Sequence, residues 1–220
     1  MKIKKIKDLG IVIPAHNELD TIDDVTRKTA LLADICVVND FSKDGTLDFL
    51  KKNRVKHINN VKQLGYEATI IKGIKYFLKK KKYIITFDAD LQFKLSDIIK
   101  AYNKIKIENA DIIVGSRIQK NRITEVILNS YFKFKYNIKD PISGLKIYKT
   151  NLLKKILKHS NKNNFLVDII TNAVKKKYKI KNFNIKTNKR LDKPRIGNIL
   201  NSNFKIFKIL IYTFFFKLNK

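Results

Sequence analysis

The sequence predicts an α/β domain built on a mostly parallel sheet with helices on both faces. Short apolar runs alternate with longer amphipathic stretches through the first 115 residues, which is the pattern of strands and covering helices. Polar, chemically active residues follow the apolar runs, where ligands bind in such sheets. The chain has 220 residues, of which 44% are hydrophobic, enough for one sizeable core and too few for two.

Apolar runs rich in β-branched residues indicate strands, and the stretches between them have helical periodicity. The predicted strands are Leu9–Pro14, Ile35–Asn39, Val55–Ile58, Tyr83–Phe87 and Asp111–Gly115. The predicted helices are 18–32, 44–53, 66–80 and 95–108. Beyond residue 120 the chain becomes Lys-rich, and we expect further strands near 144–148 and 179–186.

The net charge of +29 is concentrated in the second half of the chain. Residues 1–111 contain 22 basic and 15 acidic side chains, whereas residues 112–220 contain 26 basic and four acidic ones. Such a surface suits phosphates or anionic lipid headgroups. Nucleic acid is the competing partner, but the chain shows no aromatic and basic binding motif, so we expect no nucleic-acid function.

The cysteine content and the N-terminus bear on the compartment. The single cysteine, Cys36, lies in an apolar run, which excludes a disulfide within the chain and fits a reducing compartment. No apolar stretch of secretory length follows the basic N-terminus before Pro14. We therefore expect a cytoplasmic protein.

Two carboxylates follow the predicted strand Tyr83–Phe87. In extended backbone, the side chains of Asp88 and Asp90 point the same way, and Gln92 adds a third oxygen to the row. Hard oxygen ligands suit Mg²⁺ or Mn²⁺, which complete their shells with water and substrate phosphates. The pattern predicts a diphosphate-binding metal site, although a helix-capping aspartate beside a solvated acid would have the same sequence.

Polar residues also follow the first two predicted strands. The segment from Pro14 to Glu18 and the segment from Asp40 to Thr46 can form one cleft wall that holds a base and a ribose by hydrogen bonds. Aspartate and threonine at such positions are also ordinary capping residues.

Six motifs in order resemble glycosyltransferase family 2 and extend over about 180 residues. They are Ile11-Val12-Ile13-Pro14-Ala15-His16-Asn17-Glu18, Val37-Val38-Asn39-Asp40-Phe41-Ser42-Lys43-Asp44-Gly45-Thr46, Phe87-Asp88-Ala89-Asp90-Leu91-Gln92, Gly115-Ser116-Arg117, Asp140-Pro141-Ile142-Ser143-Gly144, and the stretch from Phe165 to Ile180. The Asp-Ala-Asp-Leu-Gln motif and Gly65-Tyr66-Glu67-Ala68 are most similar to the subgroup that makes polyprenyl-phosphate sugars.

The resemblance implies a GT-A, Rossmann-like fold and an inverting enzyme with a nucleotide-sugar donor. It assigns the metal to Asp88, Asp90 and Gln92, and an acceptor phosphate to Arg117. The nucleotide pocket would be lined by Pro14, Ala15, Asn17, Glu18, Asp40 and Gly65. The sequence departs from the family pattern at two places. It has Asn39-Asp40 where the family usually has two adjacent acids, and Gly144-Leu145 where the family usually has Gly-Phe.

The acceptor decides whether a catalytic base is needed. A hydroxyl acceptor needs a carboxylate base, and Asp140 and Asp168 are the candidates, whereas a polyprenyl phosphate is already anionic. A phosphate acceptor needs cations, for which Arg117, Arg190 and Arg195 are suited by the bidentate guanidinium fork. We favour the polyprenyl phosphate over a saccharide hydroxyl.

The C-terminal segment is intensely apolar but interrupted by lysines. The uninterrupted run between Lys208 and Lys217 is too short to span a bilayer. One helical stripe, made of Phe204, Phe207, Ile211, Phe214 and Leu218, predicts an amphipathic helix on an anionic membrane surface, with packing on its own domain or a partner as alternatives.

Together these features predict a catalytic domain over residues 1–200 and an amphipathic segment over 201–220. The donor half would be 1–117 and the acceptor half 118–200. We expect a peripheral enzyme on the cytoplasmic face of the membrane, with homo-oligomerisation left open. A nucleotidyltransferase is the competing enzyme class, but it would usually place a basic, glycine-rich loop where this chain has Pro14 to Glu18.

Overall fold

The computed structural model describes residues 4–118, 123–160, 164–188, 206–209 and 211–212. These residues form an α/β fold around one seven-stranded mixed sheet. The strands are β1 (Ile6–Ala15), β2 (Ala33–Asn39), β3 (His57–Asn59), β4 (Tyr83–Thr86), β5 (Ile112–Arg117), β6 (Lys146–Lys149) and β7 (Ile180–Ile185). The helices are α1 (Leu19–Leu32), α2 (Thr46–Lys52), α3 (Tyr66–Phe77), α4 (Leu95–Ile107), α5 (Ile123–Tyr136), α6 (Thr150–Ile156), a 3₁₀ turn (Leu157–His159) and α7 (Phe165–Lys175). The predicted fold class is confirmed.

The strand order β3-β2-β1-β4-β6-β5-β7 brings the functional strand ends to one edge. Every neighbouring pair is parallel except those of β6, which runs antiparallel to both β4 and β5. Because β4 and β5 are both antiparallel to β6, they run in the same direction as β1 and β2. The carboxyl ends of all four strands therefore lie at the same edge, as the sequence predicts.

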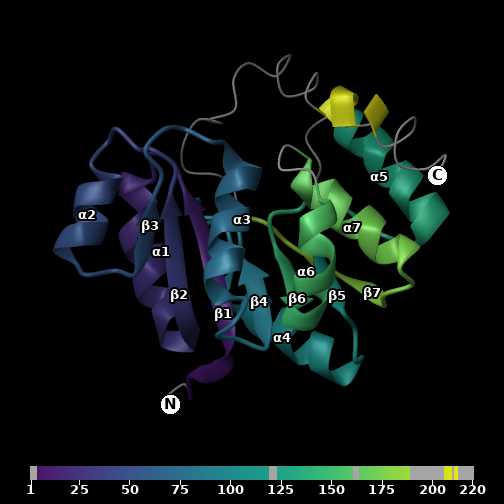
Figure 1. The fold of residues 1–220 in the computed structure, drawn as a ribbon, viewed down its shortest axis with the longest axis horizontal. Coiled ribbons are helices and arrows are strands. Elements are labelled where there is room, and N and C mark those ends of the chain that lie inside the picture. Colours follow the sequence, from purple (N-terminus) through teal and green to yellow (C-terminus); the bar gives the residue numbers. More distant parts are fainter. Residues whose placement is uncertain (1–3, 119–122, 161–163, 189–205, 210, 213–220) are drawn as a thin grey trace.

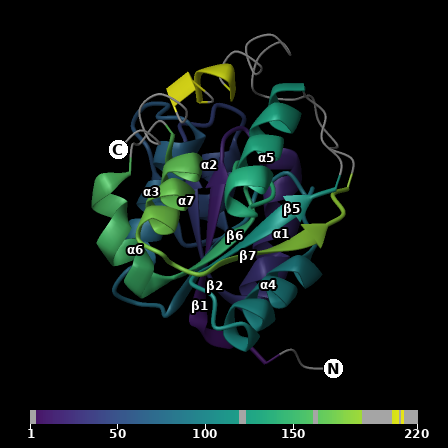
Figure 2. The ribbon, with the colours of Figure 1, turned by 90° about the vertical axis from the view of Figure 1, so that its right-hand side faces the viewer.

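Alternating residues of β1 explain why helices cover both faces (Figures 1 and 2). Ile11 and Ile13 point into a core with α1 and α4, whereas Val12 points into a second core with α3, α5, α6 and α7. Helix α3 lies very close to the sheet, because a Cβ on Gly73 would come within 2.2 Å of Val12. Burial of both faces accounts for the continuous apolar runs in the sequence.

The C-terminal segment packs on its own domain with one side. Residues 206–209 form a helical turn in which Ile206 and Ile209 are buried in the core that contains α3, α5, α6 and α7. Phe207 and Ile211 are exposed. Phe204, Phe214 and Leu218 lie outside the described residues. Within the described part of the chain, no helix combines the length and apolarity needed to cross a bilayer.

Candidate active site

The Asp88–Gln92 segment lies at the carboxyl end of β4, but it is not an extended row. The strand ends at Thr86, and the chain bends so that Asp90 accepts a 3.1 Å hydrogen bond from the Gln92 backbone N–H. Leu91 adopts a positive φ of 60°, which turns the chain between Asp90 and Gln92. The extended backbone expected from Asp88 to Gln92 is therefore wrong, since an aspartate turn replaces the strand there.

Tyr66, at the start of α3, holds the first of these carboxylates. Its buried hydroxyl donates a short hydrogen bond to Oδ1 of Asp88. Burial raises the pKa of the Tyr66 phenol, and the charge of Asp88 raises it further, so the hydroxyl stays protonated and remains a donor. The Asp88 side chain is thereby oriented from outside its own loop.

Gly144 lies against the same carboxylate from the other side. A Cβ at this position would meet Oδ2 of Asp88 at 2.2 Å and the Tyr66 hydroxyl at 2.6 Å. Only a residue without a side chain fits there. The Gly144 carbonyl also accepts a 2.5 Å hydrogen bond from Thr86 of β4, which fixes the distance between the two loops.

Asp40 ties the end of β2 to the loop that precedes α3. Its carboxylate accepts 2.8 Å hydrogen bonds from the backbone N–H groups of Leu64 and Gly65 and from the Asn60 side chain. Gly65 has a φ of 88°, a backbone conformation that favours glycine. The buried Asp40 therefore shapes this loop.

The end of β1 and the loop after it are hydrogen-bonded to β2 and to the loop that follows β2. Pro14 and Ala15 pair with β2, and Ala15 lies opposite Asn39. The side-chain oxygen Oδ1 of Asn17 accepts a 2.7 Å hydrogen bond from the Lys43 backbone N–H, and the Glu18 backbone N–H donates to the Thr46 hydroxyl at 2.9 Å. These cross-links join the loops after β1 and β2 into one surface.

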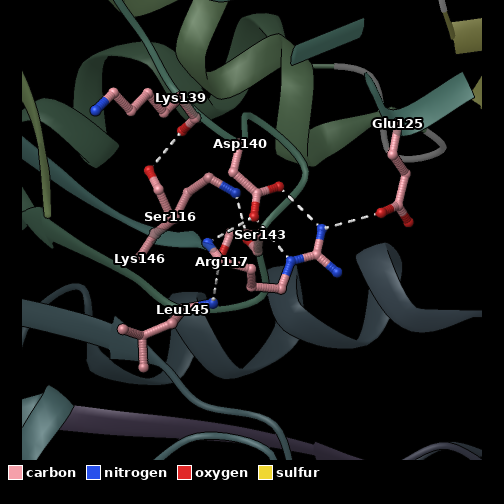
Figure 3. Close-up of polar contacts among 8 residues, drawn as sticks. All are labelled: Ser116, Arg117, Glu125, Lys139, Asp140, Ser143, Leu145 and Lys146. Carbon is pink, nitrogen blue, oxygen red and sulfur yellow. Dashed lines mark hydrogen bonds and ion pairs between the residues drawn. The ribbon is translucent and has the colours of Figure 1, made fainter. Parts of the chain in front are cut away.

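Arg117, at the end of β5, is paired with Asp140 (Figure 3). Nε and Nη2 donate to the two carboxylate oxygens at 2.8 and 2.9 Å, and the Arg117 backbone N–H donates a third bond at 3.0 Å. Glu125 of α5 lies 3.8 Å from Nη2. The guanidinium fork expected to hold phosphate thus binds Asp140, which is itself 0% exposed.

The electrostatics of this pair keep Arg117 charged. Burial by itself would lower the pKa of the guanidinium, but the hydrogen bonds and charge of Asp140 raise it, with a further contribution from Glu125. Both carboxylate oxygens of Asp140 accept hydrogen bonds from Arg117, and the residue has no exposed surface. This geometry disfavours Asp140 as the base for a hydroxyl acceptor.

Lys146, the first residue of β6, is fully buried behind the same loop. Its ammonium group donates to the Ser143 carbonyl, and its backbone N–H donates to the Thr86 hydroxyl at 3.2 Å. Burial lowers the pKa of this lysine to about 7, although Asp140 acts in the opposite direction. The loop from Asp140 to Lys146 therefore connects Arg117 on β5 with Asp88 after β4.

Of the remaining candidates, Asp168 lies within the described part of the chain. Asp168 lies on α7 with no exposed surface, and the Tyr212 hydroxyl donates to it at 3.5 Å. Arg190 and Arg195 lie outside the described residues. Glu125 and Lys146 were not predicted to lie beside Arg117 and Asp140, because no sequence pattern distinguishes one acid on a helix or one more lysine in a Lys-rich chain.

Comparison with known proteins identifies the family. The model of "Glycosyl transferase family 2" matches residues 10–174, which extend from within β1 through β6 and include Asp40, Asp88, Asp90 and Asp140. The chain belongs to glycosyltransferase family 2. It is therefore a glycosyltransferase that uses a nucleotide-sugar donor.

Two relatives and two solved structures extend this finding. An uncharacterised protein of Methanocaldococcus jannaschii is 31% identical over 94% of this chain and 93% of its own length. The UDP-N-acetylglucosamine–dolichyl-phosphate N-acetylglucosaminyltransferase of Methanococcus voltae is 27% identical over 67% of this chain and 72% of its own.

Both structures share the fold at low identity. Glucosyl-3-phosphoglycerate synthase of Mycobacterium tuberculosis, solved with Mn²⁺ and UDP-glucose, has a TM-score of 0.74 at 14% identity, covering 97% of this chain and 79% of that one. Mannosyl-3-phosphoglycerate synthase of Rubrobacter xylanophilus has a TM-score of 0.69 at 14% identity, covering 92% and 72%.

Proposed function

We propose that this family 2 glycosyltransferase moves a sugar from a UDP- or GDP-sugar to a polyprenyl phosphate, with inversion at the anomeric carbon. The observation that carries the choice of acceptor is the burial of both candidate bases. Asp140 is bound by Arg117, and both Asp140 and Asp168 have no exposed surface. A phosphate oxygen attacks as an anion, so it needs neither residue as a base.

The donor half in this proposal is residues 1–117. The base and ribose lie against Pro14, Ala15, Asn17 and Glu18 on one side and Asp40 and Gly65 on the other. The cross-linked loops after β1 and β2 support this placement, because they hold polar backbone groups in a fixed wall.

Asp88 and Asp90 with Gln92 are the proposed holders of Mg²⁺ or Mn²⁺. Two neighbouring carboxylates fit a hard cation, and the described residues contain no cluster of three or more His, Cys, Asp or Glu that would hold one alone. That donor set suits an ion whose remaining positions are filled by water and the donor diphosphate. When bound, the cation would neutralise charge that develops on the leaving diphosphate. Tyr66 and Gly144 keep the Asp88 carboxylate in place for this task.

The acceptor half is proposed to be residues 118–200, and 201–220 an amphipathic segment. Arg117 contributes positive charge near the acceptor, and its Nη1 group makes none of the contacts described above. Arg190 and Arg195 are proposed to add to this charge. The distant relative named for dolichyl phosphate supports a lipid-phosphate acceptor.

A peripheral location on the cytoplasmic face follows from such an acceptor. The exposed Phe207 and Ile211 support contact with the membrane, while the burial of Ile206 and Ile209 means that deleting the segment would also open the core. Substitutions of exposed residues are therefore the appropriate test of membrane contact.

A donor panel tests the proposed function. UDP- and GDP-sugars are incubated with Mn²⁺ and vesicles that contain polyprenyl phosphate, and released nucleotide and lipid-linked sugar are quantified together. We expect one donor to give both products in equal amounts. Nucleotide release that requires a saccharide acceptor instead would favour the second candidate, transfer to a sugar hydroxyl.

A further inference from the structure

Helix α5 buries two of its polar side chains and exposes four of its large apolar ones. Glu125 and Asn129 are buried, although both are strongly hydrophilic. On the opposite side, the exposed fractions are 78% for Ile123, 48% for Val126, 53% for Ile127 and 95% for Phe134. A helix on the surface of a protein in water normally has the reverse distribution.

The exposed apolar residues form one stripe, with the exposed Ser130 between Ile127 and Phe134. Their spacing of three, four and seven positions places all four on the same side of an α-helix. Leu128 and Phe132, which pack into the core, lie on the other side and anchor the helix to the domain. The stripe is therefore a defined face of a fixed helix.

The charges around this stripe are positive. Lys133 and Lys135 are exposed on either side of Phe134. The stretch from 118 to 167 contains two acids, Glu125 and Asp140, and both are buried beside Arg117. An apolar stripe with lysines and no exposed carboxylate of its own is the composition of a helix that lies in an anionic membrane interface.

The position of α5 relates this face to the active site. Glu125 places the inner side of α5 within 3.8 Å of Arg117. In both Figure 1 and Figure 2, α5 and the turn of residues 206–209 lie at the upper end of the molecule, away from the N-terminus. The exposed Phe207 therefore belongs to the same end of the protein as the stripe.

We infer that the outer face of α5 docks the enzyme on an anionic membrane. This docking face consists of Ile123, Val126, Ile127 and Phe134 with Lys133 and Lys135. A second copy of the chain is a poorer occupant, because a two-fold interface would bring the lysines of one copy against those of the other. The inference extends the proposed function, since docking here presents the Arg117 side of the site to a lipid acceptor, but the docking itself requires no acceptor.

Vesicle binding of the full chain tests the inference. The variant Ile123→Ser/Ile127→Ser/Phe134→Ser is compared with the native protein by co-sedimentation with equimolar phosphatidylglycerol and phosphatidylcholine, and with pure phosphatidylcholine. We expect native binding to the anionic vesicles, little to the zwitterionic ones, and a loss on the order of 100-fold in the variant, because three apolar side chains no longer enter the interface.

The matched control removes exposed apolar residues at the opposite end. Leu31 and Ile107 are 61% and 83% exposed at the C-terminal ends of α1 and α4, which run back toward the amino ends of the strands. Leu31→Ser/Ile107→Ser should bind vesicles like the native protein. Phe134→Ser alone, at an almost fully exposed position, should reduce binding without altering the thermal unfolding midpoint.

Three outcomes would overturn the inference. They are unchanged vesicle binding by the triple variant, an equal loss in the control variant, and a change of molar mass in light scattering while vesicle binding stays intact. The last would identify the face as a contact between copies. Because no sugar donor or acceptor is present, failure of the proposed transfer reaction would leave the vesicle result standing, and the reverse also holds.

Discussion

Replacing Gly144 by alanine should disable the donor site through one methyl group. The new Cβ would lie 2.2 Å from Oδ2 of Asp88, whereas an ordinary carbon–oxygen contact is about 3.3 Å, so the carboxylate or the loop must move by roughly 1 Å. A displacement of this size in a catalytic group costs about 100-fold in rate, or about 2.7 kcal/mol of transition-state stabilisation.

The effect on function must be separated from the effect on stability. Overpacking also costs about 1–3 kcal/mol of unfolding free energy. Gly10→Ala is the matched control, because its Cβ would meet the Phe77 ring at 2.6 Å in the core, in the middle of β1. Both variants should therefore lose stability in urea.

Calorimetric titration of Mn²⁺ and nucleoside diphosphate, together with kcat/KM, distinguishes the two variants. We expect Gly144→Ala to lose about 100-fold in kcat/KM and to bind Mn²⁺ and nucleotide more weakly. Gly10→Ala should bind and turn over normally below its unfolding temperature. Equal loss in both variants, or normal binding by Gly144→Ala, would refute the role given to the close approach of Gly144 and Asp88.

Four further predictions concern single side chains. Asp90→Asn should keep the native circular dichroism spectrum but lose at least about 100-fold in activity, as should the native enzyme in excess chelator; full activity in either case would rule out the metal site. Tyr66→Phe should weaken Mn²⁺ binding about 10-fold, measured by manganese electron paramagnetic resonance, and unchanged affinity would show that the hydroxyl does not orient Asp88. Asp140→Asn should lower the free energy of unfolding by about 3–5 kcal/mol because it removes the fully buried carboxylate that pairs with the partly buried Arg117, whereas Asp24→Asn at an exposed pair should cost under about 1 kcal/mol; similar costs would contradict this difference. Lys146 releases its proton near pH 7 in the folded protein and near 10.5 when unfolded, so the native protein should gain stability relative to Lys146→Met as pH rises across that range, and a pH-independent difference in urea denaturation would contradict the shift.

The sequence predicts the donor half of the fold well because its signals are local. Apolar runs with turn residues identify β1, β2, β4 and β5, and each strand is buried on both faces, which keeps the runs continuous. Strand β6 was expected from its position alone, and its antiparallel direction depends on long-range pairing with β4 and β5 that leaves no pattern in a short segment.

For the site, the sequence predicts candidate residues but not the contacts that they make. Asp88 and Asp90 follow from their place after a strand, but the turn at Leu91 depends on a positive φ that the residue type does not announce. The pairing of Arg117 with Asp140 joins residues 23 positions apart in the chain. The sequence therefore suggested that Arg117 is available for a phosphate. In the structure its guanidinium pairs with Asp140, whose fully buried carboxylate requires a partner inside the protein.

The proposed transfer to a polyprenyl phosphate depends most directly on the nature of the acceptor nucleophile. The decisive measurement compares polyprenyl phosphate with the corresponding polyprenol, at equal chain length and in the same vesicles, using the donor selected by the panel and following lipid-linked sugar. Because both candidate bases are buried, we predict product from the phosphate and none from the alcohol. Efficient transfer to the alcohol would show that a base operates in this site and would contradict the proposed reaction.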